Sequence, residues 1–458
     1  MNNYYFVGIG GIGMSALAEY LINTHEHVTG CDGDLNQKTI HHLIKKYNID
    51  ISDEKKCIEH IAAYKPTIIV ITNTVSQKHS AIIYAHENNI PIILRGKLLG
   101  EILKKKKVIG ITGSHGKTST TGITAHILKT LHYEPSIFIG GIMPLIKSNF
   151  YYAESPLALI EADDAYKSFL SLNPFISLIT SISYEHLETY TGWDDIYKTY
   201  LEYAHNTKQD GYVIINTDSQ TTQYFTSLLQ RPYISYGINK ETQDYAANDI
   251  ELHTTYSLYN LYKNKTFIAH VKIPMPGIHH VKNSVGALAI ADSLNICLKD
   301  AINTLFTHQG VERRMEYKGT YNNASVYDDY GHHPIEIQTT LDAFSRLSCG
   351  KKIVFFQPHK YSRTKALWND FIQVLSQAKI DKLYLVDIFN AGDDYDSFYN
   401  SKTLVQTLTK NGSKNIFYID TIDYNKMIKF IDNTLTSDDI ILCLGAGKLD
   451  KFADFLTQ

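Results

Sequence analysis

The residues best suited to chemistry lie between 110 and 121, in the run Gly-Ile-Thr-Gly-Ser-His-Gly-Lys-Thr-Ser-Thr-Thr. We expect backbone N–H groups around Gly113 and Gly116 to wrap a polyphosphate. The Lys117 ammonium would reach its β- and γ-phosphates, and the Thr118 hydroxyl would bind Mg²⁺. A helix beginning near Lys117 would direct its positive end at the same phosphates, so the pattern predicts an ATP-binding loop. Its predicted nucleotide-binding residues are Gly113, Ser114, His115, Gly116, Lys117, Thr118 and Ser119.

This loop departs from the strict Walker A spacing. That pattern requires a glycine five positions before Gly116, where Ile111 stands. An ordinary glycine-rich turn before a threonine-rich helix is the alternative interpretation. The adjacent Gly-Lys-Thr favours ATP binding over that alternative.

A second glycine-rich loop, Gly-Ile-Gly-Gly-Ile-Gly at residues 8–13, follows one predicted strand and opens a predicted helix. Gly8 would form the turn, Gly10 would allow close approach of a pyrophosphate, and Gly13 would pack the helix. Asp32 ends the next predicted strand, where a carboxylate can bind a ribose. Because this fingerprint reads a diphosphate beside a nucleoside, it fits NAD(P) or a UDP-sugar. A tight turn that binds nothing is the third alternative.

Acidic and histidine side chains follow two predicted strands beyond the phosphate loop. Glu161 ends the apolar stretch Leu157–Ile160, and Glu185 and His186 follow the stretch Phe175–Thr180. Ligands of open α/β sheets bind at the carboxyl ends of the strands. A carboxylate there is a candidate Mg²⁺ ligand, and His186 is a candidate ligand of a second ion. Alternatively, Glu161 is an ordinary residue at a helix N-terminus, and His186 is a histidine that binds no metal.

Composition narrows the class of protein. The chain has 458 residues, 44% hydrophobic and 20% charged, with a formal net charge of −3. This net charge shows no excess of basic residues of the kind that binds nucleic acid. The N-terminus lacks the features of a signal peptide. No apolar run approaches the roughly 18 residues of a membrane span, and five scattered cysteines without a Cys-x-x-Cys pair indicate a reducing compartment. We expect a cytoplasmic protein with no nucleic-acid or membrane partner.

Short apolar runs alternate with amphipathic stretches, which predicts parallel sheets covered by helices. Three such series predict three tandem α/β domains: Rossmann-like at 1–103, P-loop ATPase-like at 104–308 and Rossmann-like at 309–458. The predicted strands are Tyr4–Gly8, Val28–Cys31, Thr67–Thr72, Ile92–Arg95, Leu157–Ile160, Phe175–Thr180, Ser325–Tyr327, Ile353–Phe356, Lys382–Val386, Ile416–Ile419 and Asp439–Leu444. The predicted helices include Met14–Leu21, Lys38–Lys46 and His279–Ser293.

Together these motifs resemble those of the Mur ligase family, the ATP-dependent amide-bond ligases that assemble the peptidoglycan stem peptide. Thr-Gly-Ser-His-Gly-Lys-Thr-Ser-Thr matches the family's variant phosphate loop, which accounts for the unusual spacing. The resemblance covers essentially the whole chain, through GIGGIGMS (8–15), EAD (161–163), EHLETY (185–190), PGIHHVKN (276–283), GVERR (310–314), DDYGHHP (328–334), QPHKYSRT (357–364) and LGAG (444–447).

The resemblance implies ATP- and Mg²⁺-dependent ligation of L-alanine to the lactyl carboxylate of UDP-N-acetylmuramate. ATP would phosphorylate the carboxylate to an acyl phosphate. The amine would then attack, and phosphate would depart from the resulting tetrahedral intermediate. Positioning and charge neutralisation would therefore dominate catalysis. A monomer or weak homodimer is expected. The implied contacts with the UDP end of the sugar nucleotide are Gly10, Gly11, Gly13 and Asp32.

The family pattern also implies roles around ATP and the amino acid. Lys117 would contact phosphates, Thr118 and Glu161 would bind one Mg²⁺, and His186 a second. Near adenine the pattern implies His279 and Asn283, and near the ribose or phosphates Arg314 and Asp329. Around the amino acid it implies His332, His359 and Arg363, with Arg363 on the carboxylate. The predicted catalytic residues are Lys117, His186, His332 and Arg363.

Some positions depart from the family pattern. Lys360 stands where arginine is usual, and lysine lacks the bidentate fork that suits a carboxylate, which places more of the amino-acid binding on Arg363. Other departures are Ser114 for threonine, His280 for asparagine, and the less acidic stretch 164–167.

Three alternative functions remain open at this stage. The first is a sibling ligase, such as the tripeptide-recycling branch or an enzyme that adds another amino acid, although the segments 328–334 and 357–364 resemble the alanine-adding branch more than the others. A nicotinamide oxidoreductase built on residues 1–100 would leave Lys117 and Glu161 without a purpose. A non-catalytic nucleotide-binding regulator is the third.

Overall fold

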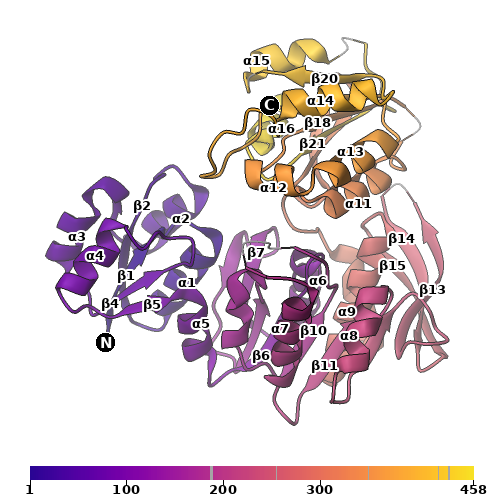
Figure 1. The fold of residues 1–458 in the computed structure, drawn as a ribbon. Helices are drawn as coiled ribbons and strands as arrows, with labels where there is room; N and C mark the ends of the chain where they lie inside the picture. The colour runs from indigo at the N-terminus through magenta and orange to yellow at the C-terminus, as the bar shows by residue number, and fades with distance from the viewer. Residues whose placement is uncertain (186–188, 254, 349, 421, 432–433) are drawn as a thin grey trace. The chain divides into compact units, whose positions relative to one another are not determined.

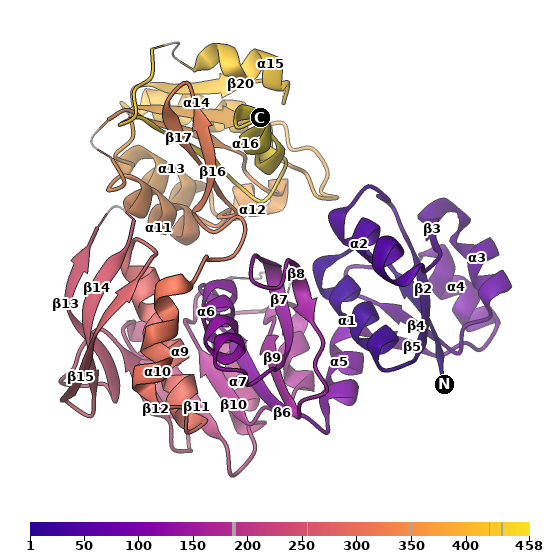
Figure 2. The same cartoon turned by 180° about the vertical axis from the view of Figure 1, so that it is seen from behind.

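The computed structural model describes residues 1–458 except 186–188, 254, 349, 421 and 432–433. Three β-sheets covered by helices follow one another along the chain, which confirms the predicted class of three tandem α/β domains (Figures 1 and 2). Within the described part of the chain, no helix is both long enough and apolar enough to cross a bilayer. The chain divides into two compact units: Met1–Asp249 with Tyr259–Val271 and Val281–Gln309, and Ile250–Leu258 with Lys272–His280 and Gly310–Gln458.

The first sheet is parallel, in the order β3-β2-β1-β4-β5. Successive β1 side chains enter opposite apolar layers: Tyr4 and Phe6 join the cluster that includes α1, α2 and α5, whereas Tyr5 and Val7 join the one that includes α3 and α4. The strands are β1 (Asn3–Val7), β2 (His27–Asp32), β3 (Ile51–Asp53), β4 (Ile68–Ile71) and β5 (Ile92–Leu94). The helices are α1 (Ile12–Asn23), α2 (Lys38–Tyr47), η1 (Glu54–Lys56), α3 (Cys57–Tyr64), α4 (Ser80–Glu87) and α5 (Arg95–Leu103).

The second sheet has ten strands, in the order β15-β14-β13-β12-β11-β10-β6-β9-β7-β8. Since β9, β6 and β10 are parallel neighbours, the loops that follow them share one edge of the sheet. The strands are β6 (Lys107–Thr112), β7 (Ser136–Met143), β8 (Ser148–Tyr151), β9 (Leu157–Glu161), β10 (Ile176–Ile179), β11 (Tyr212–Asn216), β12 (Ile234–Gly237), β13 (Tyr245–Leu252), β14 (Ser257–Lys263) and β15 (Thr266–Ile273). The helices are α6 (Lys117–Thr130), η2 (Ala165–Ser171), α7 (Trp193–His205), α8 (Gln220–Leu228), α9 (Ile278–Ser293), α10 (Leu298–Thr304) and η3 (Leu305–Thr307).

The third sheet has the order β16-β17-β21-β18-β19-β20, and only its β16–β17 pairing is antiparallel among those described. Ile353 and Phe355 of β18 join a core with α16, and Val354 and Phe356 join one with α11, α13 and α14. The strands are β16 (Glu316–Tyr321), β17 (Ala324–Asp329), β18 (Lys352–Phe356), β19 (Lys382–Val386), β20 (Ile416–Ile419) and β21 (Ile440–Leu444). The helices are α11 (Pro334–Phe344), α12 (Tyr361–Ala366), α13 (Trp368–Gln377), α14 (Ser401–Lys410), α15 (Tyr424–Met427), η4 (Ile428–Phe430) and α16 (Leu449–Leu456).

All the predicted strands and helices are present, with ends within two residues of the prediction. The prediction did not name the strands β3, β7, β8, β11, β12, β13, β14, β15 and β16. Strands β13, β14 and β15 carry mixed burial; most β15 side chains, for example, are exposed or half-buried, so no continuous apolar run marks them. Strand β11 does have a buried apolar run, which the prediction overlooked.

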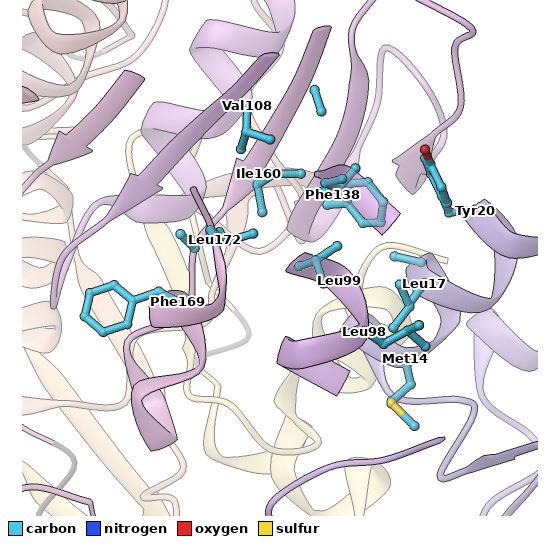
Figure 3. Packing of buried hydrophobic residues seen from close by; sticks show 14 of the residues in the cluster. Met14, Leu17, Tyr20, Leu98, Leu99, Val108, Phe138, Ile160, Phe169 and Leu172 are labelled. Atoms are coloured by element: carbon cyan, nitrogen blue, oxygen red, sulfur yellow. The ribbon is translucent and has the colours of Figure 1, made fainter. Parts of the chain in front are cut away.

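Helix α5 joins the first sheet to the second through close backbone contacts. Leu98 and Leu99 belong to one apolar cluster with Met14 and Leu17 of α1 and with Val108, Phe138, Ile160, Phe169 and Leu172 (Figure 3). On the same helix, a Cβ added at Gly100 would lie 2.1 Å from the Ser171 carbonyl oxygen. Glycine is therefore needed for α5 to approach η2 this closely.

We expect Gly100→Ala to destabilise the protein. Alanine is favoured over glycine in a helix interior by about 1 kcal/mol, so a net loss must come from the collision with the Ser171 carbonyl. The free energy of unfolding, measured with urea, should fall by about 1–3 kcal/mol. Lys97→Ala, an exposed change on α5, is the control and should change it by less than about 0.5 kcal/mol. A Gly100→Ala protein as stable as the wild type would contradict the close packing.

Candidate active site

The phosphate loop connects β6 to α6 and requires glycine at two positions. Gly113 and Gly116 have φ angles of +129° and +84°, which disfavour residues with a Cβ. A Cβ at Gly113 would lie 2.2 Å from Thr180 Oγ1, and one at Gly116 would lie 2.9 Å from Asn283 Oδ1. The loop therefore packs against the segment after β10 on one side and against α9 on the other.

Hydrogen bonds bind the loop to the segment that follows β10. The Ser114 N–H donates to the Ser181 carbonyl (3.0 Å), the His115 N–H to Ser181 Oγ (2.9 Å), and the Ser183 N–H to Ser114 Oγ (2.7 Å). His115 also pairs with Glu185 at 2.7 Å. Because two loop amides serve these bonds, the first turn of α6 is the better source of N–H groups for a phosphate.

The Lys117 ammonium is held at the centre of this loop. Its Nζ lies 2.9 Å from Asp164 Oδ1 and donates to the carbonyls of Gly113 and Ser114. The Asp164 side chain is 3% exposed and accepts a hydrogen bond from the Tyr200 hydroxyl at 2.8 Å. Burial alone would lower the pKa of Lys117, but the nearby aspartates, Asp164 above all, outweigh it and raise that pKa. Lys117 is therefore a fixed positive charge.

Thr118 and Glu161 form an oxygen pair beside the loop. The Thr118 hydroxyl donates to Glu161 Oε1 at 2.8 Å, and the Gly140 N–H donates to Oε2 at 2.6 Å. Two oxygens at right angles on one Mg²⁺ lie about 2.9 Å apart, given Mg–O distances of about 2.0–2.1 Å. The hard donors and their separation fit this ion. The predicted second ligand, His186, lies outside the described residues.

The predicted adenine residues both lie on α9. The Asn283 side chain is buried against Gly116 of the phosphate loop. In the second compact unit, His279 lines a cavity of about 400 Å³. Other residues that line this cavity include Pro276, Ile278, Thr339, Asp342 and Arg346.

The N-terminal glycine loop is organised by a carboxylate. Asp32 Oδ2 accepts the Gly10 N–H at 2.8 Å, and Oδ1 accepts from Gln37 Nε2 at 2.8 Å. Gly8 has a φ of +75°, and a Cβ at Gly10 would lie 2.8 Å from Gln37 Oε1. Asp32 therefore shapes the loop, a role that the ribose prediction did not include.

Asp329 has a similar place in the third sheet, at the carboxyl end of β17. Its carboxylate accepts the Met315 and Gly331 N–H groups, each at 2.8 Å, and the Thr340 hydroxyl at 3.0 Å. Burial raises its pKa, and the positive charge of Arg314 opposes that shift. The structure thus brings the predicted pair Arg314 and Asp329 within electrostatic reach of each other.

His332, His359 and Arg363 gather at the carboxyl edge of the third sheet. The two imidazole rings lie 5.5 Å apart, and His359 stacks on Phe389 at 5.6 Å. Arg363 Nη1 donates to His359 Nδ1 at 3.1 Å, so that nitrogen carries no proton. Burial lowers the pKa of His332 to about 4 and that of His359 to about 3, so both rings are neutral at pH 7. Arg363 is the fixed cation of this cluster.

Several residues that hold these loops were missed from sequence. Gln357 accepts the Lys448 N–H at 2.7 Å and donates to the Asp387 carbonyl at 2.9 Å, which ties the loops after β18, β19 and β21 together. A Cβ at Gly447 would lie 2.1 Å from Gln357 Oε1. Asp164 was also missed as the partner of Lys117, although it directly follows Glu-Ala-Asp at 161–163.

Three α/β sheets in tandem, with glycine-rich loops at their carboxyl edges, are typical of nucleotide-binding enzymes. Residues 3–107 match the family model described as "Mur ligase family, catalytic domain", residues 111–291 the "Mur ligase middle domain", and residues 313–447 the "Mur ligase, glutamate ligase domain". The chain belongs to the Mur ligase family, whose members are ATP-dependent ligases, as its motifs predicted.

Relatives extend over the full length. The chain is 33% identical over 459 residues to UDP-N-acetylmuramate–L-alanine ligase of Clostridium acetobutylicum, covering 99% of this chain and 97% of that protein. The crystal structure of UDP-N-acetylmuramate–alanine ligase from Thermotoga maritima superposes with a TM-score of 0.81 at 26% identity, covering 100% and 98% of the two chains. A murein peptide ligase from Psychrobacter arcticus shares the fold, with a TM-score of 0.74 at 20% identity over 100% and 98% of the chains.

We expect Lys117→Ala to lower kcat/KM for ATP-dependent turnover by at least roughly 10²-fold, because the substitution removes the fixed positive charge of the loop. Thermal stability should also fall, since the buried Asp164 carboxylate loses this ammonium. The double variant Lys117→Ala/Asp164→Asn should regain most of the stability but none of the activity. Phosphate release and thermal melts measure the two effects. Activity in the double variant would contradict the assigned role of Lys117.

Acid should destabilise the folded protein through its buried neutral histidines. Burial lowers the pKa of His308 to about 3, whereas an unfolded histidine has a pKa of about 6.5. As pH falls below about 6.5, the unfolded chain binds protons that the folded chain does not, so stability present above pH 6.5 is progressively lost. His308→Phe removes one such group. Between pH 7.5 and 5, the unfolding free energy of this variant should therefore fall by up to about 2 kcal/mol less than that of the wild type. Equal urea-denaturation losses for both proteins would contradict this.

Proposed function

We propose that this protein joins L-alanine to the lactyl carboxylate of UDP-N-acetylmuramate, with ATP as the source of energy. The observation that carries the proposal is the 33% identity, over 99% of the chain, to a relative with that name. We assign the sugar nucleotide to residues 1–103, ATP to 104–308 and L-alanine to 309–458. The geometry of each loop edge supports the chemistry that this reaction needs.

A free carboxylate is a poor acceptor for an amine, because the leaving group would be oxide. The γ-phosphate of ATP would be transferred to the carboxylate, which releases ADP and forms an acyl phosphate. When the amine attacks the acyl carbon, phosphate leaves readily. Both reactants are anions, so Lys117, fixed by Asp164, would neutralise charge on the transferred group. Mg²⁺, held by Thr118 and Glu161, would supply further neutralisation when bound.

The amino acid would be held by the cluster at the carboxyl edge of the third sheet. Arg363 is its fixed cation and offers a planar fork to the carboxylate, which Lys360 cannot match. His332, with a pKa of about 4, is a weaker base than the α-amino group of a peptide, whose pKa is about 8, and the amine of a free amino acid is more basic still. His332 therefore fits the positioning of the amine better than its deprotonation.

Phosphate release with ATP and Mg²⁺ tests the proposal. We expect release that requires UDP-N-acetylmuramate together with L-alanine, and by mass spectrometry a product heavier by one alanyl residue. Glycine and L-serine should compete weakly. Lys117→Ala serves as the inactive control. Release only with a γ-linked tripeptide would assign the protein to a recycling role, and no release with any acceptor would overturn the proposal.

A further inference from the structure

Arg95 stands at the edge of the first sheet where ligands bind. It is the first residue of α5 and directly follows β5, whereas the loop at residues 8–13 follows β1. The strands β1, β4 and β5 are parallel, so both connections leave the same edge of the sheet. In parallel sheets this carboxyl edge is the binding edge.

The Arg95 guanidinium lies directly on the glycine loop. A Cβ added at Gly13 would come within 2.8 Å of Arg95 Nη1 and 3.4 Å of its Cζ. Gly13 belongs to the first turn of α1, whose N–H groups and dipole favour an anion. The positive charge of Arg95 therefore adds to that of the helix terminus.

The partner of Arg95 in the described structure is a weak one. Arg95 Nη2 lies 3.4 Å from Asp163 Oδ2, which is long for a charge-assisted hydrogen bond, and the Asp163 side chain is 44% exposed. A guanidinium has five N–H donors, and this contact uses one of them. A second anion can therefore bind the same group.

Helix α5 holds Arg95 in place. Leu98 and Leu99 are buried against α1 (Figure 3), and a Cβ at Gly96 would meet Ser168 Cβ at 3.0 Å. A guanidinium on a fixed helix loses less freedom on binding than one on a mobile loop. The backbone that carries Arg95 is thus held in place before a ligand binds.

The loop itself needs a cation. The Asp32 carboxylate lies 2.8 Å from the Gly10 N–H, so an anion bound to the loop would face this negative charge. Arg95 carries the compensating charge at the other end of the loop.

We propose that Arg95 binds the diphosphate of the sugar nucleotide, exchanging its contact with Asp163 for phosphate oxygens. This inference rests on the proposed function, which supplies a nucleoside diphosphate as ligand. The planar fork suits two phosphate oxygens, and no sequence motif singled out this residue.

Calorimetry with UDP and with UDP-N-acetylmuramate, in the absence of ATP, tests the proposal. Arg95→Ala should weaken both affinities roughly 10- to 100-fold and raise the KM of the sugar nucleotide alike. The KM values of ATP and L-alanine should stay within about twofold. Arg95→Lys should fall between wild type and Arg95→Ala, and it keeps the apolar stem if the alanine variant folds poorly. Lys97→Ala, on the exposed face of α5, is the charge-matched control and should bind UDP like the wild type.

The variant Asp163→Asn distinguishes two roles for Arg95: binding of the diphosphate, and a purely structural ion pair with Asp163 (a clamp). If Arg95 acts on the diphosphate, this variant should bind UDP at least as well as the wild type, because the competing carboxylate is gone. An equal loss of UDP affinity in Asp163→Asn and Arg95→Ala would overturn the proposal in favour of a clamp. Unchanged affinity in Arg95→Ala would overturn it outright. A wild type that binds UDP tightly but does not ligate L-alanine would reject the proposed function while leaving the diphosphate contact standing.

Discussion

The buried ion pair between Lys117 and Asp164 underlies the whole phosphate-loop edge of the second sheet. An ammonium taken out of water is costly unless a carboxylate and further acceptors surround it. Here Asp164 and two loop carbonyls supply them, and the Tyr200 hydroxyl satisfies the carboxylate in turn. The loop can therefore carry a fixed positive charge in a backbone conformation that requires glycine at 113 and 116.

A second theme is the use of strand-end carboxylates to shape loops. Asp32 and Asp329 each accept backbone N–H groups of a neighbouring loop, and Glu161 accepts the Gly140 N–H beside Thr118. Each acid stands where a parallel strand ends, which is also where ligands bind. Each of these side chains thus both shapes a loop and places a negative charge on it, and the cations Lys117 and Arg95 lie at the same edges, each paired with an aspartate.

Much of the candidate site could be predicted because it is encoded locally. Gly113, Gly116 and Lys117 act within one loop. Thr118 and Glu161 are 43 positions apart, and their geometry fits the metal pair that the resemblance to the family implied. Pairings between distant segments that no motif implied could not be predicted. Asp164 meets Lys117 across 47 positions, and Arg95 meets Asp163 across 68. No periodicity in a sequence records which charged side chains face each other once the sheets have formed.

The sequence by itself determined the three α/β series, the order of the loops and the family, because strand periodicity and glycine spacing are properties of short segments. Tertiary structure alone decided the extra strands β13–β15, whose mixed burial leaves no continuous apolar run. It also decided the neutral state of His332 and His359, since burial lowers the pKa of an imidazole and only the folded chain buries it.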